Sequence, residues 1–287
     1  MDTVIGVIGG SGLYALDGLT DLREVAYDTP YGRPSDVLVH GRLGGARLVF
    51  LPRHGRGHRL LPTEVPYRAN VHALKQAGVG WLISVSAVGS LRAHIEPGHA
   101  VLADQYIDRT RHREGTFFGN GLVGHIAFGD PTCDALRAYL AAACREAGAV
   151  VHEKGVYVCM EGPAFSTRAE SELHRAWGAA VIGMTALPEA KLAREASMSY
   201  ATLAFATDYD CWHPDHDAVT VEQVVGVLMS NVARAKDILG HAARLIAAHD
   251  GPPPHHDALR TAIFTDKAAI SAAVRERLGP ILAPYLA

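Results

Sequence analysis

The chain has 287 residues, 48% of them hydrophobic, and a formal net charge of −3. This charge excludes the basic footprint of proteins that bind nucleic acid or anionic membranes, and no apolar run approaches the about 20 residues of a membrane span. Four cysteines without CxxC spacing, and an amino terminus that enters a strand without a signal peptide, are typical of a reducing cytosol. We therefore expect a cytoplasmic protein with a single α/β domain.

The first predicted strand, residues 3–8, runs into the glycine loop Gly9-Gly10-Ser11-Gly12. Glycines let a backbone approach an anion closely and Ser11 adds a hydroxyl donor, which favours a phosphate site. The pattern Gly10-x-Gly12-x-x-Ala15 also matches a dinucleotide fingerprint. That fingerprint has to open a helix, and the residues after Leu13 break the helical period. We therefore favour a phosphate-binding loop over a dinucleotide site.

A loop over 25–36 leads to two strands, 37–39 and 47–51, that are predicted to form a hairpin around Leu43-Gly44-Gly45. The second strand delivers Arg53, His54 and His58 beside glycines. Arginine offers a planar fork to an oxyanion and histidine a switchable donor. A solvated basic loop is the better explanation of this stretch when it is considered alone. An amphipathic helix is expected over 66–77.

The strand predicted over 81–87 ends in Val88-Gly89-Ser90, where backbone and hydroxyl donors face the same anion. A strand over 99–107, a polar and mobile segment over 108–120, a helix over 131–147 and a strand over 155–160 follow. Ser166 or Thr167 then caps a helix that reaches residue 177, and Glu170 completes a capping box if Thr167 is the cap. We favour a hydrophobic staple over a ligand-stacking ring for Phe165.

A short strand over 180–185 and a helix with Pro188 in its first turn precede the apolar strand 200–208. In an extended chain Asp208 and Asp210 share one face at the carboxyl end of that strand, where open α/β sheets bind ligands. Two like charges in a partly desolvated site raise the proton affinity of one of the two carboxyls. That carboxyl can then donate a hydrogen bond while its neighbour accepts one. This suits N7 and the amino group of a 6-aminopurine. A solvated Asp-rich turn explains this stretch equally well.

A long helix is expected over 219–249, and prolines at 252–254 mark a linker. We accordingly expect a domain over 1–250 and a Pro-rich linker with a helical tail over 251–287. The apolar end of the tail is expected to pack on its own chain or on a neighbouring one.

Motifs at the predicted strand ends follow one another in a recognisable order. They are Ile8-Gly9-Gly10-Ser11-Gly12-Leu13, Asp28-Thr29-Pro30-Tyr31-Gly32, Pro34-Ser35-Asp36, Arg53-His54-Gly55, Gly89-Ser90-Leu91, Asp104-Gln105-Tyr106-Ile107-Asp108-Arg109-Thr110, Glu161-Gly162-Pro163 and Thr207-Asp208-Tyr209-Asp210-Cys211-Trp212. In order and spacing, over residues 3–250, they resemble the 5′-methylthioadenosine phosphorylases, a trimeric branch of the purine nucleoside phosphorylase superfamily. The tail shows no convincing match.

The resemblance implies a single α/β domain with a central mixed, partly barrel-like sheet flanked by helices. It implies reversible phosphorolysis of 5′-methylthioadenosine to adenine and 5-methylthioribose 1-phosphate, a reaction of purine and methionine salvage. Inorganic phosphate is the co-substrate, and neither a metal nor an organic cofactor is needed. It also implies a homotrimer whose active sites lie between subunits.

The resemblance further assigns roles to residues at the matching positions. Phosphate would be held by Ser11, Arg53, His54, Ser86 and Thr185. The nucleoside would be bound by Ala87, Phe165, Ile182, Met184, Asp208, Asp210 and His125. Met184 would face the ribose, and Phe165, Ile182 and the two aspartates would surround the base. His125 would come from a neighbouring subunit to close the methylthio pocket, near which His58 also lies.

Cleavage of the N-glycosidic bond builds positive charge on the sugar and negative charge on the leaving purine. A phosphate dianion under the anomeric carbon stabilises the first and then attacks. We expect Asp208 to protonate N7 and Asp210 to bind or support the 6-amino edge. Because a free Asp has a pKa of about 3.9, the site has to raise the pKa of Asp208 or share its proton with N7.

Four positions depart from the resembled family. Ser11 and Ser86 stand where many relatives have Thr and keep the hydroxyl, whereas Gly183 replaces a frequent Asn and Ala164 a frequent Arg. Phosphorylases of 6-oxopurines usually carry Asn at the base-reading position, so Asp208 favours adenine. The alternatives are a methylthioinosine or general purine nucleoside phosphorylase, an NAD-dependent oxidoreductase and a non-catalytic nucleoside-binding protein.

Overall fold

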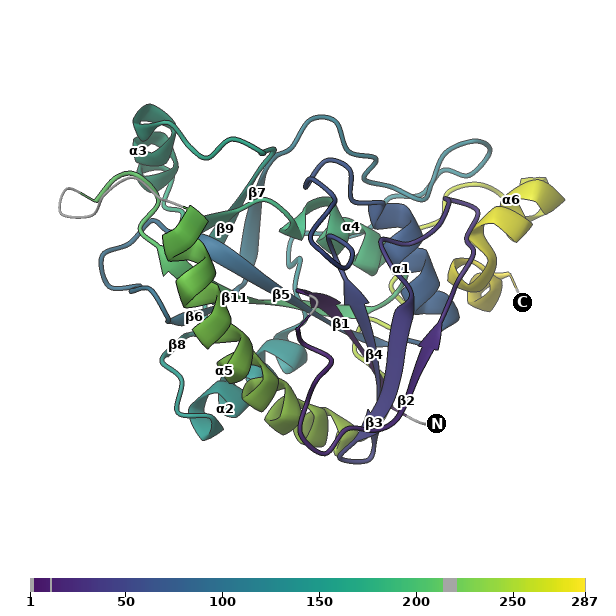
Figure 1. Cartoon of the computed structure of the whole chain (residues 1–287). Helices are drawn as coiled ribbons and strands as arrows, with labels where there is room; N and C mark the ends of the chain where they lie inside the picture. The colour runs from purple at the N-terminus through teal and green to yellow at the C-terminus, as the bar shows by residue number, and fades with distance from the viewer. Residues whose placement is uncertain (1–2, 11, 214–220, 287) are drawn as a thin grey trace.

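The computed structural model describes residues 3–10, 12–213 and 221–286, with side chains described from residue 231 in the last range. Within these ranges the chain forms an 11-stranded mixed sheet flanked by helices (Figure 1). The strands are β1 (Val4–Gly9), β2 (Thr20–Val25), β3 (Leu38–Leu43), β4 (Ala46–Pro52), β5 (Trp81–Ser90), β6 (Ala100–Ala103), β7 (Gln105–Arg109), β8 (Val151–His152), β9 (Val156–Met160), β10 (Val181–Gly183) and β11 (Ser199–Asp208). The α-helices are α1 (Tyr67–Gln76), α2 (Asp134–Glu146), α3 (Arg168–Ala176), α4 (Ala186–Glu195), α5 (Val221–Ala247) and α6 (Ala272–Leu278).

The sheet has the order β2-β3-β4-β1-β5-β10-β9-β7, and β11 pairs with both β5 and β6. β1 runs parallel to β4 and β5, and β5 runs parallel to β11. The carboxyl ends of these four strands therefore meet at one edge of the sheet, which is where α/β sheets bind ligands. β10 returns antiparallel along the end of β5, with Val181 opposite Ser90 and Ile182 opposite Gly89.

Helices cover both faces of the sheet, and each face has its own apolar core. Side chains alternate along β1, so that Ile5 and Val7 pack in the core with α2 and α5, while Val4 and Ile8 pack in the core with α1 and α4. Figure 1 shows α3 and α6 at opposite ends of the molecule. The fold class expected from the sequence is confirmed.

Most predicted elements are present, with two informative differences. β2 was not predicted, because its residues are polar and mostly exposed and show no apolar alternation. The strand expected over 99–107 is instead two strands, β6 and β7, separated at Asp104. The carboxylate of Asp104 accepts a hydrogen bond from the Gly155 N–H at 2.9 Å. The predicted β3–β4 hairpin is confirmed.

The segment after residue 250 packs on its own chain. Leu259, Leu278 and Ile281 are buried in the same core as α1 and α4. Arg277 Nη1 donates to the Phe117 carbonyl at 3.1 Å. The tail thus contributes apolar burial to the core, at roughly 1.5–3 kcal/mol for each fully buried large side chain.

Candidate active site

One edge of the sheet gathers most of the residues predicted to bind phosphate and nucleoside. Arg53 and His54 directly follow β4, Ser86 and Ala87 lie in β5, Ile182 lies in β10 ahead of Met184 and Thr185, and Asp208 ends β11. Thr185 follows β10 by two residues and is the N-cap of α4. Residues 12–19 form turns and coil in place of the helix that a dinucleotide fingerprint has to open. Ser11 lies outside the described residues.

A turn brings Asp208 and Asp210 together, so the prediction that they share one face of an extended strand was wrong. β11 ends at Asp208, and Asp210 has a left-handed backbone with φ of 50°. The Asp210 N–H donates to Asp208 Oδ1 at 2.8 Å. Gly89 leaves room for this turn, because a Cβ at residue 89 would lie 3.0 Å from Asp208 Oδ1 and 3.3 Å from the Cβ of Asp210.

Burial raises the pKa of the Asp208 carboxyl, and the nearby Asp210 charge adds to the rise. The Thr207 hydroxyl donates to Asp208 Oδ2 at 2.6 Å and, with the Asp210 N–H, opposes that rise. The direction of the pKa shift agrees with the prediction, and both expected causes contribute, desolvation more than the charge of Asp210. Asp210 is 7% exposed, and its buried Oδ2 has no hydrogen-bond partner among the described residues. The pair therefore offers a carboxyl of raised proton affinity beside an unengaged acceptor.

Arg53 is held by a buried carboxylate that sequence reasoning did not find. Its Nε and Nη2 donate to Glu189 at 2.9 and 3.2 Å, and the two side chains are 3% and 1% exposed. Nη2 also donates to Ser84 Oγ at 2.7 Å, and Nη1 donates to the Val85 carbonyl at 3.0 Å. Since Nη1 carries two hydrogens, it is the part of the guanidinium best placed to meet a further acceptor. Glu189 therefore fixes the orientation of the Arg53 guanidinium group.

His54 differs from the switchable donor expected of it. Its Nδ1 lies 2.8 Å from the Leu60 carbonyl, which only accepts, so Nδ1 carries the proton. Burial, followed by the Arg53 charge, lowers the pKa of the ring to about 4. At neutral pH the ring is therefore uncharged, and Nε2 is an acceptor. Such an Nε2 can accept from a protonated phosphate oxygen but cannot donate to a dianion.

The hydroxyl of Ser86 is buried and has no hydrogen-bond partner among the described residues. A cavity of about 50 Å³ lies beside Ser86 and Ala87 and reaches α5. The cavity is also lined by Asn231, which is 3% exposed and has neither amide atom hydrogen-bonded within the described ranges. In the sequence, Asn231 stands out only as an amide side chain among the regularly spaced apolar residues of the predicted long helix.

The loop before α3 presents an exposed aromatic ring. Thr167 caps α3 and forms the predicted capping box with Glu170. Phe165 is 51% exposed and stands two residues before that cap, so the favoured staple interpretation was wrong. The ring is free to stack on a planar ligand. The Cys211 thiol donates to the Ser166 carbonyl at 3.3 Å, which ties this loop to the residues after Asp210.

Arg113 is a second positioning residue that sequence reasoning missed, in the segment expected to be polar and mobile. Its side chain is 1% exposed. Nη1 donates to the carbonyls of Met184 and Leu187 at 2.6 and 2.7 Å, and Nη2 donates to the Glu161 carbonyl at 2.8 Å. Arg113 therefore fixes the chain between β10 and α4, which carries Met184 and Thr185.

His125 is the predicted site residue that lies apart from the others. Its N–H donates to the Ala262 carbonyl at 2.8 Å, and its ring meets that of Phe264 edge to face at 5.2 Å. Phe264 is 70% exposed and belongs to the segment that precedes α6, whereas Phe165 precedes α3 at the opposite end of the molecule (Figure 1). The contacts of His125 are therefore with the segment that leads into α6.

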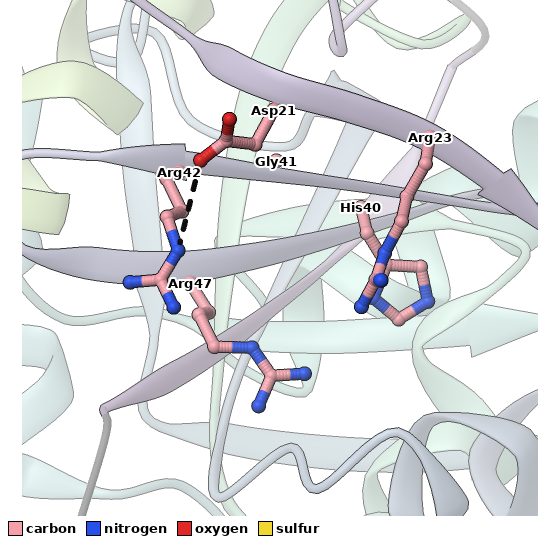
Figure 2. Close-up of a pocket in the computed structure, with 6 residues that line it drawn as sticks. All are labelled: Asp21, Arg23, His40, Gly41, Arg42 and Arg47. Atoms are coloured by element: carbon pink, nitrogen blue, oxygen red, sulfur yellow. Dashed lines mark ion pairs between the residues drawn. The ribbon is translucent and has the colours of Figure 1, made fainter.

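A separate pocket of about 250 Å³ lies on the β2–β4 side of the sheet (Figure 2). Figure 2 shows Arg23, Arg42, Arg47 and His40 around it, with Asp21 paired to Arg42 at 3.8 Å. None of the predicted site residues lines it. Across the described ranges we find no group of three or more His, Cys, Asp or Glu arranged to hold a metal ion. No described helix is long and apolar enough to cross a membrane.

Comparison with known proteins identifies the family. A profile of the Phosphorylase superfamily matches residues 4–244. S-methyl-5′-thioadenosine phosphorylase of Geobacter sulfurreducens is 59% identical over 287 residues, covering 100% of both chains. The enzyme of the same name from Thermosynechococcus vestitus is 54% identical over 289 residues, again covering 100% of both.

Solved structures agree. A methylthioadenosine phosphorylase from an Antarctic soil metagenomic library superposes with a TM-score of 0.94 at 48% identity, covering 98% of this chain and 99% of that one. Methylthioadenosine phosphorylase from Schistosoma mansoni, in complex with adenine, gives 0.81 at 38% identity, covering 87% and 93%. The chain belongs to the phosphorylase superfamily and, within it, to the methylthioadenosine phosphorylases.

Proposed function

We propose that this enzyme catalyses reversible phosphorolysis of 5′-methylthioadenosine to adenine and 5-methylthioribose 1-phosphate. The observation that carries the proposal is the Asp208–Asp210 pair, where a carboxyl of raised pKa stands beside a buried acceptor. The names of the relatives, and the adenine bound by the Schistosoma mansoni enzyme, support the same substrate.

In this proposal Asp208 donates a proton to N7 as the glycosidic bond breaks, and Asp210 Oδ2 accepts from the 6-amino group. Phe165 stacks on the base. Phosphate lies between Arg53 and His54, which follow β4, and the hydroxyls of Ser86 and Thr185. Its charge stabilises the developing sugar cation, and one of its oxygens then attacks the anomeric carbon.

Each side chain of the phosphate site contributes a different group. Arg53, oriented by Glu189, supplies positive charge, and the two hydroxyls supply donors. His54 Nε2 accepts the hydrogen of a monoprotonated phosphate, which leaves an unprotonated oxygen to face the sugar. The proposal needs phosphate as a co-substrate and no metal or organic cofactor. We place the enzyme in the cytoplasm, where its four cysteines, all free, remain reduced.

We further propose a homotrimer in which His125 completes the methylthio pocket of a neighbouring chain. His125 packs on Phe264, and Val123 and Phe264 beside it are 54% and 70% exposed. Large exposed apolar side chains that gather at one place favour a protein interface. Mixing Asp208→Asn subunits with His125→Ala subunits should restore activity in mixed oligomers. Two inactive variants that never rescue one another would refute shared sites.

The reaction is tested by release of free base from four nucleosides, with and without phosphate. We expect methylthioadenosine to react best and only when phosphate is present. Faster cleavage of methylthioinosine or inosine would instead assign the chain to 6-oxopurines and refute the role of Asp208. Binding without phosphate-dependent turnover would indicate a nucleoside-binding protein.

A further inference from the structure

Gly183 has no room for a side chain, and the reason is a tyrosine hydroxyl. A Cβ at residue 183 would lie 2.0 Å from Tyr157 Oη and 2.7 Å from its Cζ, far inside contact distance. Gly183 is also not among the described glycines with positive φ, so its backbone does not require glycine. The phenol of Tyr157 therefore occupies the space that the side chain of residue 183 would fill.

The Tyr157 hydroxyl is buried without a well-formed hydrogen bond. Tyr157 lies in β9 opposite Val181 of β10, and its side chain is 0% exposed. Its Oη has no hydrogen-bond partner among the described residues. Leaving such a group unsatisfied costs about 1–3 kcal/mol, whereas phenylalanine would fill the same space without that cost. A ligand that accepts from this hydroxyl would account for its presence.

The surroundings of the hydroxyl indicate which ligand it meets. The charge of Arg53 opposes the rise in the pKa of Tyr157, as do weak hydrogen bonds with the Ser86 side chain and the Thr185 backbone, neither of which has good hydrogen-bond geometry. Burial outweighs these three and raises the pKa of Tyr157, so the phenol stays protonated and can donate. Ser86 Oγ is itself buried and unpartnered within the described ranges. Two buried hydroxyls without a well-formed hydrogen bond therefore lie near one another and within the influence of the Arg53 charge.

We propose that Tyr157 is a phosphate-binding residue whose hydroxyl donates to the bound anion from the space left by the missing side chain at residue 183. The proposal rests on the proposed function, because the phosphate site of that function supplies the acceptor. It adds a donor from β9 to those expected from β4, β5 and the end of β10. Tyr157 and Gly183 depend on one another, because the phenol fills the space that a side chain at residue 183 would need.

Tyr157→Phe removes only the hydroxyl. We expect the KM for phosphate to rise about 10- to 100-fold, as for the loss of one charged hydrogen bond, with little change in the KM for methylthioadenosine. Without ligand the Tm should stay the same or rise, because an unsatisfied group is lost. The extra stabilisation that phosphate gives the wild-type enzyme should shrink. A merely structural hydroxyl would instead lower the Tm and leave the KM for phosphate unchanged.

Tyr106→Phe is the matched control. Tyr106 packs edge to face on Tyr157 at 5.8 Å, but its hydroxyl is already bonded to Thr202 Oγ1 at 2.7 Å. We expect this variant to lower the Tm and to leave the KM for phosphate within about twofold, a difference of about 0.4 kcal/mol.

Titration calorimetry with inorganic phosphate separates this proposal from the proposed function. If methylthioadenosine is not cleaved but Tyr157→Phe still weakens phosphate binding, the reaction assignment fails and this site stands. If the wild-type enzyme turns over and Tyr157→Phe binds phosphate as well as the wild type does, the proposal is overturned.

A compensating pair of changes gives a second test. Gly183→Asn alone should disrupt the site, because its Cβ would lie within 2.0 Å of Tyr157 Oη. Combining it with Tyr157→Leu vacates the space and supplies an amide donor in place of the phenol. We expect the double variant to bind phosphate better than either single variant. Equal or weaker binding by the double variant would contradict the shared space.

Discussion

Replacing Glu189 by glutamine tests whether the buried pair with Arg53 organises the phosphate site. The change preserves volume and removes one negative charge from a place where both partners are at most 3% exposed. Arg53 then keeps its hydrogen bonds to Ser84 and the Val85 carbonyl but loses its counter-ion. Tyr200, whose hydroxyl donates to Glu189 Oε1 at 3.1 Å, faces an amide in place of a carboxylate.

The expected loss of stability is large because an uncompensated charge remains buried. Breaking one partner of such a pair costs about 3–5 kcal/mol. With an unfolding entropy of about 2.1 cal/mol/K per residue, a chain of 287 residues has about 0.6 kcal/mol/K in total. Glu189→Gln should therefore lower the Tm by about 5–8 °C. It should also raise the KM for phosphate, since the guanidinium is no longer oriented.

The assay is thermal unfolding at one fixed protein concentration, with and without phosphate, alongside phosphate kinetics. A control that removes both charges, Arg53→Met with Glu189→Leu, should recover part of the Tm but no phosphate affinity. A decrease in Tm of less than about 1 °C for Glu189→Gln, about 0.6 kcal/mol at this entropy, would refute the reasoning.

Three further predictions concern the base, the pH response and α3. Asp208→Asn should lower kcat/KM for methylthioadenosine by about 10²–10⁴-fold and improve relative use of methylthioinosine, and unchanged selectivity would contradict base reading. Burial raises the pKa of Glu195 to about 7 from 4.5, so its contribution to stability is fully present below pH 4.5 and is lost as pH rises through 7. Relative to Glu195→Gln, the wild type should lose about 3 kcal/mol, or about 5 °C in Tm, between pH 4.5 and 8, and parallel pH curves would exclude this. Thr167→Ala should cost about 1 kcal/mol by removing the α3 cap, measured by urea unfolding; no loss would mean that water replaces the cap.

The sequence was sufficient to predict the family, the fold class and most strands, because apolar runs that end in glycine or polar residues were easy to recognise. Asp208 was placed correctly at the end of β11. The left-handed turn at Asp210 was not predicted, because it depends on a hydrogen bond to the Asp208 side chain and on the space above Gly89. Alternation along a strand describes only residues that remain extended.

The residues that sequence reasoning missed are those whose partners are distant along the chain. Glu189 meets Arg53 across 136 residues, and Arg113 reaches the Met184 carbonyl across 71. Periodicity and local motifs carry no information about such pairs. The pattern around Tyr157 predicted an ordinary buried strand residue, and the space around Gly183 reveals where its hydroxyl lies. The assigned roles of the individual site residues remain predictions for the experiments above.

The most direct test of the central claim, that the purine departs protonated at N7 by Asp208, uses the 7-deaza analogue of methylthioadenosine. Carbon at position 7 can neither accept that proton nor hydrogen-bond to the carboxyl. The analogue should bind, since the 6-amino edge facing Asp210 is intact, yet be cleaved at least about 10²-fold more slowly in phosphate buffer. Cleavage at a rate within a few-fold of that of methylthioadenosine would contradict the account.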